Sequence, residues 1–287
     1  MGIRTDILTD KKDTPTLSII TVNLNNRDGL KRTIDSVVSQ TFTDYEWIVI
    51  DGGSTDGSRD LIEKYQDHFT YWCNEPDKGI YNAMNKGIAH AKGEWLQFLN
   101  SGDWLYENTT LEKVFSKDYT ADVLYGDSLY ISKVKNFAHI CPDKISLSYL
   151  YSDFLNHQAT FYNKSVFDRH SYDETNRIYS DWQLSLRLIL DGKVFTHLPY
   201  YIVYYNFEGL SSNFNEQLAA EYNNIKRNTI PHHLNIDMIR LIALNPLLDY
   251  TDIAHHKSYR WIIKITNLKL KLLQKTIKLL ERHKVKK

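Results

Sequence analysis

The sequence has only two cysteines, Cys73 and Cys141, and they do not form a C-x-x-C pair. Two isolated cysteines favour neither a disulfide scaffold nor a zinc site. The chain also has no run of the ~18 apolar residues that a membrane span requires, and its polar residues 1–14 contain no apolar signal region. We therefore expect the body of the protein to be cytosolic.

The sequence has no excess charge of either sign, because 35 Lys and Arg balance 35 Asp and Glu. This balance argues against bulk nucleic-acid binding. The charge is unevenly distributed, since residues 257–287 contain eleven Lys or Arg and one acid, Glu281. The preceding residues then carry 24 basic and 34 acidic groups, a net charge of 24 − 34 = −10. We expect an acidic body with a basic tail.

Internal repeats and low-complexity linkers are also absent, and apolar strand patterns alternate with helical ones instead. The expected strands are 17–23, 45–51, 69–73, 95–99 and 123–125, and the expected helices are 28–40, 58–67 and 80–91. This alternation predicts an α/β fold with a doubly wound, mostly parallel sheet. The pattern weakens after residue 127, where we expect a strand at 157–162, a helix at 181–192, an extended segment at 194–205 and helix from 214 onward.

Aromatic residues are abundant, at 13% of the chain with 20 Tyr and 6 Trp. Tyr and Trp offer a flat face and a polar tip, which suits contacts with sugars and nucleobases. Filling of core and surface explains most of them equally well.

Polar turns occur where ligands bind in open α/β sheets, at the carboxyl ends of strands and at helix N-termini. Asp51 closes a strand and could accept a hydrogen bond from a base or ribose, although Asp also favours turns. Lys78 and Gly79 precede the helix at Ile80, where free N–H groups suit a phosphate. The alternative for this pair is an ordinary solvated turn.

A second group of polar residues lies further along the chain. The turn 100–103 offers one carboxylate, Asp103, which suits a divalent cation on a phosphate or a plain helix cap. Asp181 heads a helix and could be a general base, an N-cap or both. His157 precedes an apolar strand, where a structural histidine is the more common reading.

The order and spacing of four motifs resemble glycosyltransferase family 2, whose members are inverting enzymes with a GT-A fold. The motifs are Thr21-Val22-Asn23-Leu24-Asn25-Asn26, Ile50-Asp51-Gly52-Gly53-Ser54-Thr55-Asp56-Gly57, Asp77-Lys78-Gly79 and Leu99-Asn100-Ser101-Gly102-Asp103. Ser180-Asp181-Trp182 and Phe207-Glu208-Gly209-Leu210-Ser211-Ser212 extend the similarity, which covers about 17–212.

The resemblance implies a GT-A domain at 15–212, with a nucleotide-sugar half at 15–127 and an acceptor half at 128–212. A helical extension at 213–287 follows. On the donor side, the implied contacts with the nucleotide sugar are Thr21, Asn23, Asp51, Lys78, Gly79, Asn100 and Ser101.

The resemblance also assigns the catalytic chemistry. Asp181 matches the family's catalytic base, and Asp103 matches its DxD segment, which holds Mg²⁺ or Mn²⁺ on the diphosphate. Two departures stand out: Gly52 replaces a frequent second acid, and the 100–103 turn has only one carboxylate. Asp103 would then hold the ion with phosphate and water, or with His157, and a weak or optional metal stays open.

The resemblance implies a hexosyl- or N-acetylhexosaminyltransferase. Such an enzyme moves a sugar from a nucleotide sugar, preferably a UDP-sugar, to a glycan or lipid-linked acceptor by direct displacement. In the tail 259–287, five basic residues form one helical stripe opposite a broad apolar arc. Such a helix suits peripheral docking on the cytoplasmic membrane face, or packing on the body or a second subunit.

Two other functions compete with this one. A nucleotidyltransferase needs a basic Gly-rich loop after the first strand, which residues 25–29 supply poorly. An inactive nucleotide-sugar sensor or partner subunit is favoured by the reduced metal motif and disfavoured by Asp181.

Overall fold

The computed structural model describes residues 14–207 and 216–244. The chain divides into two compact units, residues 1–225 and 226–287. The domain boundary expected at residue 212 stays a prediction. Helix α7 (Glu216–Thr229) crosses from the first unit into the second, which also contains α8 (His232–Leu244). The tail 259–287 lies outside the described residues.

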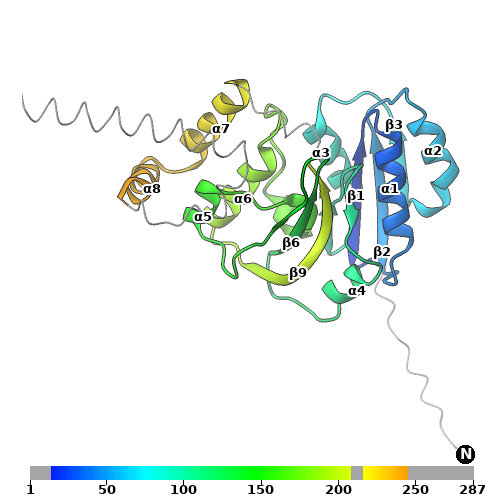
Figure 1. Ribbon diagram of the computed structural model, residues 1–287, viewed down its shortest axis with the longest axis horizontal. Helices are drawn as coiled ribbons and strands as arrows, with labels where there is room; N and C mark the ends of the chain where they lie inside the picture. Colours follow the sequence, from blue (N-terminus) through cyan, green and yellow to red (C-terminus); the bar gives the residue numbers. More distant parts are fainter. Residues whose placement is uncertain (1–13, 208–215, 245–287) are drawn as a thin grey trace, which may run out of the picture. The chain divides into compact units, whose positions relative to one another are not determined.

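The first half of the sheet is parallel, as the sequence predicts. Strands β1 (Leu17–Asn23), β2 (Tyr45–Asp51), β3 (Tyr71–Asn74) and β4 (Trp95–Phe98) run in the spatial order β3-β2-β1-β4. Helices α1 (Arg27–Val38), α2 (Ser58–Tyr65) and α3 (Ile80–His90) connect them (Figure 1). This alternation confirms the predicted α/β class, because parallel neighbours need a crossover connection.

The second half of the sheet mixes strand directions. Strand β8 (Thr160–Asn163) is antiparallel to β4 and to β6 (Val123–Ile131), whereas β9 (Phe195–Asn206) is parallel to β6. As a result β6 and β9 point the same way as β4, and their carboxyl ends reach the same edge of the sheet. Two short strands, β5 (Trp104–Leu105) and β7 (Phe137–His139), pair with β9 and β6.

The expected strand 157–162 is divided into a 3-10 turn, His157–Ala159, and β8. The expected helix at 181–192 corresponds to α6 (Ser180–Leu190). Two short helices, α4 (Thr110–Val114) and α5 (Leu147–Ser152), complete this half. Within the described residues, none of the helices combines the length and the apolar character needed to cross a membrane.

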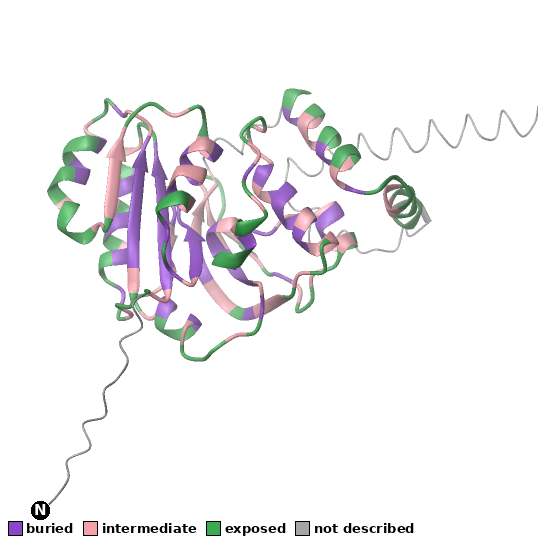
Figure 2. Ribbon diagram, turned by 180° about the vertical axis from the view of Figure 1, so that it is seen from behind, coloured by how far each residue is buried: buried purple, intermediate pink, exposed green. Residues whose placement is uncertain are grey.

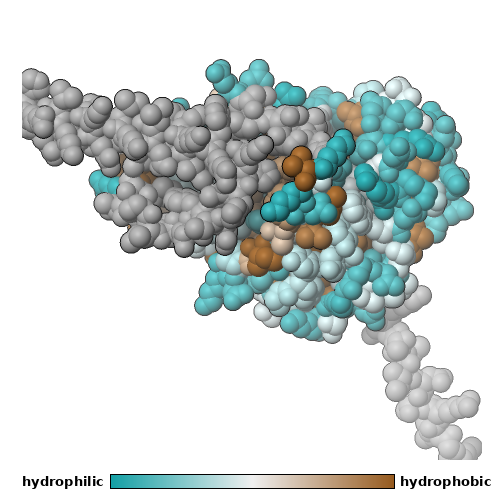
Figure 3. All heavy atoms as spheres, viewed as in Figure 1, coloured by the Kyte–Doolittle hydropathy of each residue, from teal (hydrophilic) through white to brown (hydrophobic). Residues whose placement is uncertain are grey.

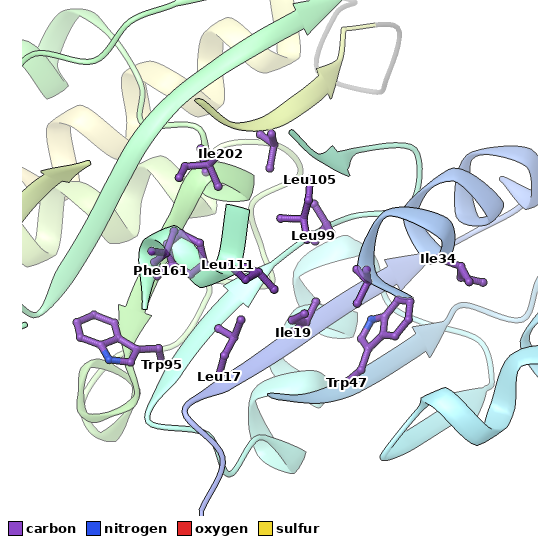
Figure 4. Close-up of a cluster of buried hydrophobic side chains, with 14 of the residues drawn as sticks. Leu17, Ile19, Ile34, Trp47, Trp95, Leu99, Leu105, Leu111, Phe161 and Ile202 are labelled. Carbon is purple, nitrogen blue, oxygen red and sulfur yellow. The ribbon is translucent and has the colours of Figure 1, made fainter. Parts of the chain in front are cut away.

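Apolar side chains cover both faces of the sheet, which makes the sheet the middle layer of three. One buried cluster joins alternate residues of β1 and β2 to α1, α2 and α4, and includes Ile19, Ile34 and Trp47 (Figure 4). The other cluster joins the intervening strand residues to α3 and α6. Figure 2 shows the central strands buried and the outer helix faces exposed. Burial on both faces explains why apolar residues predominate on both sides of these strands.

Candidate active site

Three polar side chains form a row at the carboxyl edge, where Asn23, Asp51 and Asn74 are register partners on adjacent strands. The Asp51 carboxylate is fully buried. It accepts hydrogen bonds from Asn23 Nδ2 at 2.6 Å, Ser54 N at 2.8 Å, Ser54 Oγ at 2.6 Å and Asn74 Nδ2. Four hydrogen bonds match the number of lone pairs that one carboxylate offers. Asp51 therefore stabilises the ends of β1 and β3 and the turn after β2.

One acceptor in this row has no protein partner. Asn23 Oδ1 is buried and makes no hydrogen bond, although its amide nitrogen binds Asp51 and Ser54. An unpaired buried acceptor is costly, so this oxygen is a candidate contact for a ligand N–H or O–H. By contrast, Thr21 is fully buried and its hydroxyl accepts a hydrogen bond from Trp47 Nε1 at 3.0 Å.

Lys78 and Gly79 lie at the N-terminus of α3. Lys78 is exposed, and its backbone N–H donates to Asn82 Oδ1 at 3.2 Å, whereas the N-cap residue Gly79 has no side chain to cap the helix. Gly79 has φ of 128°, a conformation in which a side chain would be strained. Glu75 N donates to Asp51 O at 3.0 Å, which brings this turn against the Asp51 row. The helix therefore presents its positive end beside that row.

The turn 100–103 is anchored to α1. The Thr33 hydroxyl donates to Asp103 O at 2.7 Å and accepts from Gly102 N at 3.0 Å. Asn26 Nδ2 donates to Ser101 O at 2.9 Å. Gly102 has φ of 103°, which a residue with a side chain adopts only with strain. These contacts fix the backbone that carries Asp103.

Asp103 is 5% exposed, and its carboxylate binds two residues from the second half of the chain. Gln158 Nε2 donates to its Oδ2 at 2.7 Å, and Asn206 N donates to its Oδ1 at 2.8 Å. Burial raises the pKa of Asp103 to about 7, against the effect of these hydrogen bonds. A nearby cation or metal would favour the charged form.

Asp181 is the centre of a second polar cluster, at the start of α6. Its Oδ1 accepts from Trp182 N at 2.8 Å and lies 3.0 Å from the Tyr81 hydroxyl. Its Oδ2 lies 2.6 Å from His157 Nδ1, and His157 Nε2 lies 3.0 Å from Asn100 Nδ2. With the Asn100 amide donating to Nε2, Nδ1 carries the ring proton and donates it to Asp181.

The loop before α6 is held by Glu221 of α7, a residue that the sequence did not single out. Its carboxylate accepts from three consecutive amides, those of Arg177 at 2.9 Å, Ile178 at 3.0 Å and Tyr179 at 2.9 Å. The next residue, Tyr222, stacks on Trp182 with ring centroids 4.5 Å apart. Both contacts fix the backbone on either side of Asp181.

The structure therefore brings most of the predicted residues together. Asn23 and Asp51 share one cluster, and Asn100, His157 and Asp181 share another. The sequence motifs assigned no role to the residues that support these clusters: Ser54, Asn74, Tyr81, Gln158, Asn206 and Glu221. Asn74 had a detectable signal, because it also ends a strand at this edge.

Comparisons with known proteins identify the family. Residues 18–183 match the family described as Glycosyl transferase family 2. A PGL/p-HBAD biosynthesis glycosyltransferase of Mycobacterium bovis is 32% identical over 210 residues, which cover 69% of this chain and 80% of the relative. The chain belongs to glycosyl transferase family 2 and is a glycosyltransferase.

Solved structures identify the fold. TarS of S. aureus, residues 1–349 in complex with UDP-GlcNAc, gives a TM-score of 0.64 at 15% identity, and the match covers 83% of this chain and 75% of that 1–349 chain. The mannosyltransferase PcManGT of Pyrobaculum calidifontis, in complex with GDP-Man and Mn²⁺, gives a TM-score of 0.55 at 13% identity, with 92% and 87% covered. The fold is GT-A.

Proposed function

We propose that the protein is an inverting glycosyltransferase that moves a sugar from a nucleotide sugar, UDP-linked by first choice, to a hydroxyl of a glycan or lipid-linked acceptor. The observation that supports this proposal is the hydrogen-bonded line Asn100–His157–Asp181. It lies at the same edge of the sheet as the row formed by Asn23, Asp51 and Asn74. It sets a partly exposed carboxylate beside a site suited to a nucleotide.

Asp181 is the proposed general base. The acceptor oxygen attacks the anomeric carbon while the bond from that carbon to the diphosphate oxygen breaks, and the acceptor proton passes to the Asp181 carboxylate. One displacement without an enzyme nucleophile inverts the anomeric configuration. The Asp181 side chain is 19% exposed, so an acceptor hydroxyl can approach it. His157 Nδ1–H orients the carboxylate through Oδ2.

Lys78 and the N-terminus of α3 are the proposed electrostatic partners of the donor diphosphate. The helix N-terminus presents positive partial charge, and Lys78 adds a flexible cation. The unpaired Asn23 Oδ1 is the proposed acceptor for a base or ribose donor group. The nucleotides named with TarS and PcManGT differ, UDP-GlcNAc in one and GDP-Man in the other, so UDP is a proposal to test.

Mg²⁺ or Mn²⁺ fits this site as an ion shared with substrate. Among the described residues, no group of three His, Cys, Asp or Glu side chains could hold a metal. The same turn does offer two oxygen donors of the hard type these ions prefer, the buried Asp103 carboxylate and Asn100 Oδ1, which has no hydrogen-bond partner. These residues would hold the ion, with phosphate and water as further ligands, and the ion would offset diphosphate charge.

The contacts of His157 favour a role as the hydrogen-bond partner of Asp181 over a role as a metal ligand. Both of its ring nitrogens have partners, Asp181 and Asn100. Binding a metal through either nitrogen would break one of these contacts. A metal role for His157 stays a prediction that metal titration of a His157→Gln variant can test.

Two observations support a lipid-linked acceptor and membrane association. The mycobacterial relative is named for PGL/p-HBAD biosynthesis, and the 259–287 tail has a basic amphipathic pattern. Co-sedimentation with anionic liposomes of the full chain and a form ending at residue 252 tests the tail. Equal sedimentation would contradict membrane docking.

Thermal unfolding with a panel of nucleotide diphosphates and nucleotide sugars, with and without Mn²⁺, tests the donor. A ligand at 100 times its Kd stabilises the fold by about 2.7 kcal/mol. We expect a shift with UDP or one UDP-sugar that is weaker in Asp103→Ala. No shift with any nucleotide would contradict the proposal and favour an inactive relative, for which the single carboxylate of the 100–103 turn is the supporting observation.

A further inference from the structure

Four aromatic side chains form a continuous set on β5, β9 and the residue after β5, which we call the aromatic strip: Trp104, Tyr106, Tyr201 and Tyr204. Trp104 stacks on Tyr204 with centroids 5.1 Å apart and planes at 20°. Tyr106 lies 5.1 Å from Tyr204 and 5.2 Å from Tyr201. All four are half-buried, so the rings are ordered by one another and keep part of their surface in solvent.

The strip borders a groove of about 480 Å³ between α1 and β5. From α1 the groove is lined by Arg32 and Asp35, from the turn after α1 by Gln40, and from the chain after β5 by Glu107 and Asn108. The Arg32 guanidinium lies 5.3 Å from the Trp104 ring. Figure 3 views the molecule from the α1 side and shows a pale region of intermediate hydropathy beside the teal of this helix.

The strip begins beside the proposed active site. Trp104 directly follows Asp103, and Asn206, two residues after Tyr204, binds the Asp103 carboxylate. Leu105 points into the core beside Ile202 (Figure 4), which directs its neighbours Trp104 and Tyr106 to the other side of β5. At about 3.3 Å per residue, Tyr106 lies ~7 Å further from the active-site edge than Trp104.

This combination has the chemistry of a saccharide subsite. The electron-rich ring faces attract the polarised C–H bonds on the flat side of a sugar. The Asn108 amide, the Asp35 and Glu107 carboxylates and the Arg32 guanidinium line the groove and can bind its hydroxyls. We propose that the aromatic strip and its groove bind sugar units of the acceptor, beyond the unit that receives the transferred sugar. The inference rests on the proposed function, because it assumes a saccharide acceptor.

Direct binding of uncharged tetrasaccharides of glucose, N-acetylglucosamine and mannose tests the strip, by calorimetry and by tryptophan fluorescence on the full chain. We expect at least one to bind, and Trp104→Ala and Tyr106→Ala each to weaken it about tenfold, which is 1.4 kcal/mol. Tyr65→Ala, at a half-buried tyrosine of α2 outside the groove, is the matched control and should leave binding unchanged.

The outcomes separate the two proposals. Binding of none of the three sugars, or equal binding by Trp104→Ala, overturns the subsite, and so does a concentration-dependent dimer that both strip variants abolish. UDP stabilisation should be the same in wild type, Trp104→Ala and Tyr106→Ala, which also shows that the variants fold. If the protein binds a saccharide but no nucleotide stabilises it, the proposed donor site is contradicted and the proposed saccharide subsite is retained.

Discussion

Asp51 and Asp181 both lie near the same edge of the sheet. Their carboxylates differ in exposure and in the number of hydrogen bonds that they accept from the protein. Asp51 is fully buried and accepts four hydrogen bonds from its own fold. The Asp181 side chain is 19% exposed and lies against His157, Tyr81 and Trp182 N. A saturated carboxylate stabilises turns, whereas one that is open to solvent can exchange a proton with a substrate.

Residue type and position therefore do not by themselves assign a role at this edge. In the sequence each aspartate has a structural and a functional interpretation: a turn residue or a ligand contact for Asp51, and an N-cap or a general base for Asp181. Burial and the number of donors separate them. Substitution should therefore lower the free energy of unfolding at Asp51 and the rate of sugar transfer at Asp181.

The largest effect is expected for Asp181→Asn, which keeps the shape and removes the base. We expect sugar transfer to fall by roughly 10²–10⁴-fold, with UDP stabilisation retained. Initial rates with a competent acceptor, together with thermal unfolding, measure both. Asp191→Asn, at the exposed far end of α6, is the control. A folded Asp181→Asn that keeps most of its activity would remove Asp181 from the mechanism.

Asp51→Ala should act on the fold instead. It leaves the Asn23, Ser54 and Asn74 donors without their acceptor, and each buried group left unpaired costs about 1–3 kcal/mol. We expect the free energy of unfolding to fall by about 3 kcal/mol or more in urea titration. Asp60→Ala, at an exposed carboxylate of α2, should change it by less than about 0.5 kcal/mol. Equal stability of the two variants would refute the structural role.

An effect of intermediate size is expected at Asp103, because burial raises the pKa of its carboxyl from 3.8 to about 7. In the unfolded chain the carboxyl loses its proton near pH 4, whereas the folded protein keeps it until about pH 7. Its contribution to stability is therefore present below pH 4 and is lost as the pH rises toward 7, at about 1.4 kcal/mol per pKa unit.

Asp103→Asn should remove that pH dependence. In chelator-treated protein without nucleotide, we expect the variant to gain stability relative to wild type between pH 4 and pH 8, as measured by urea unfolding. Asp44→Asn, at an exposed carboxylate, should follow wild type. Parallel pH curves for Asp103→Asn and wild type would show that the buried carboxyl does not titrate in this range.

A smaller effect is expected for Glu221→Ala, which releases three backbone amides before α6. Because Glu221 acts through the position of Asp181, kcat should fall by about tenfold, or ~1.4 kcal/mol, with little change in the KM for the donor. Glu221→Gln should retain part of the activity, since its amide oxygen still accepts, and Glu216→Ala on the same helix is the control. A change in donor KM alone would contradict a positioning role.

The sequence predicted the parallel half of the fold well, because β1, β2 and β4 are short, predominantly apolar strands between amphipathic helices. It could not predict β5 and β7, which are two and three residues long and depend on pairing with distant β9 and β6. For the site, motif order identified the strand-end residues. Glu221 could not be found, since its role depends on a contact more than 40 residues away in sequence.

The most direct test of the account is the anomeric configuration of the product, followed by proton NMR from the first turnovers with a donor of known configuration. Direct displacement with Asp181 as base predicts the opposite configuration at the transferred sugar. A product that retains the donor configuration from the first turnovers would contradict the mechanism, because retention requires a second displacement or a front-face route that the Asp181 arrangement does not provide.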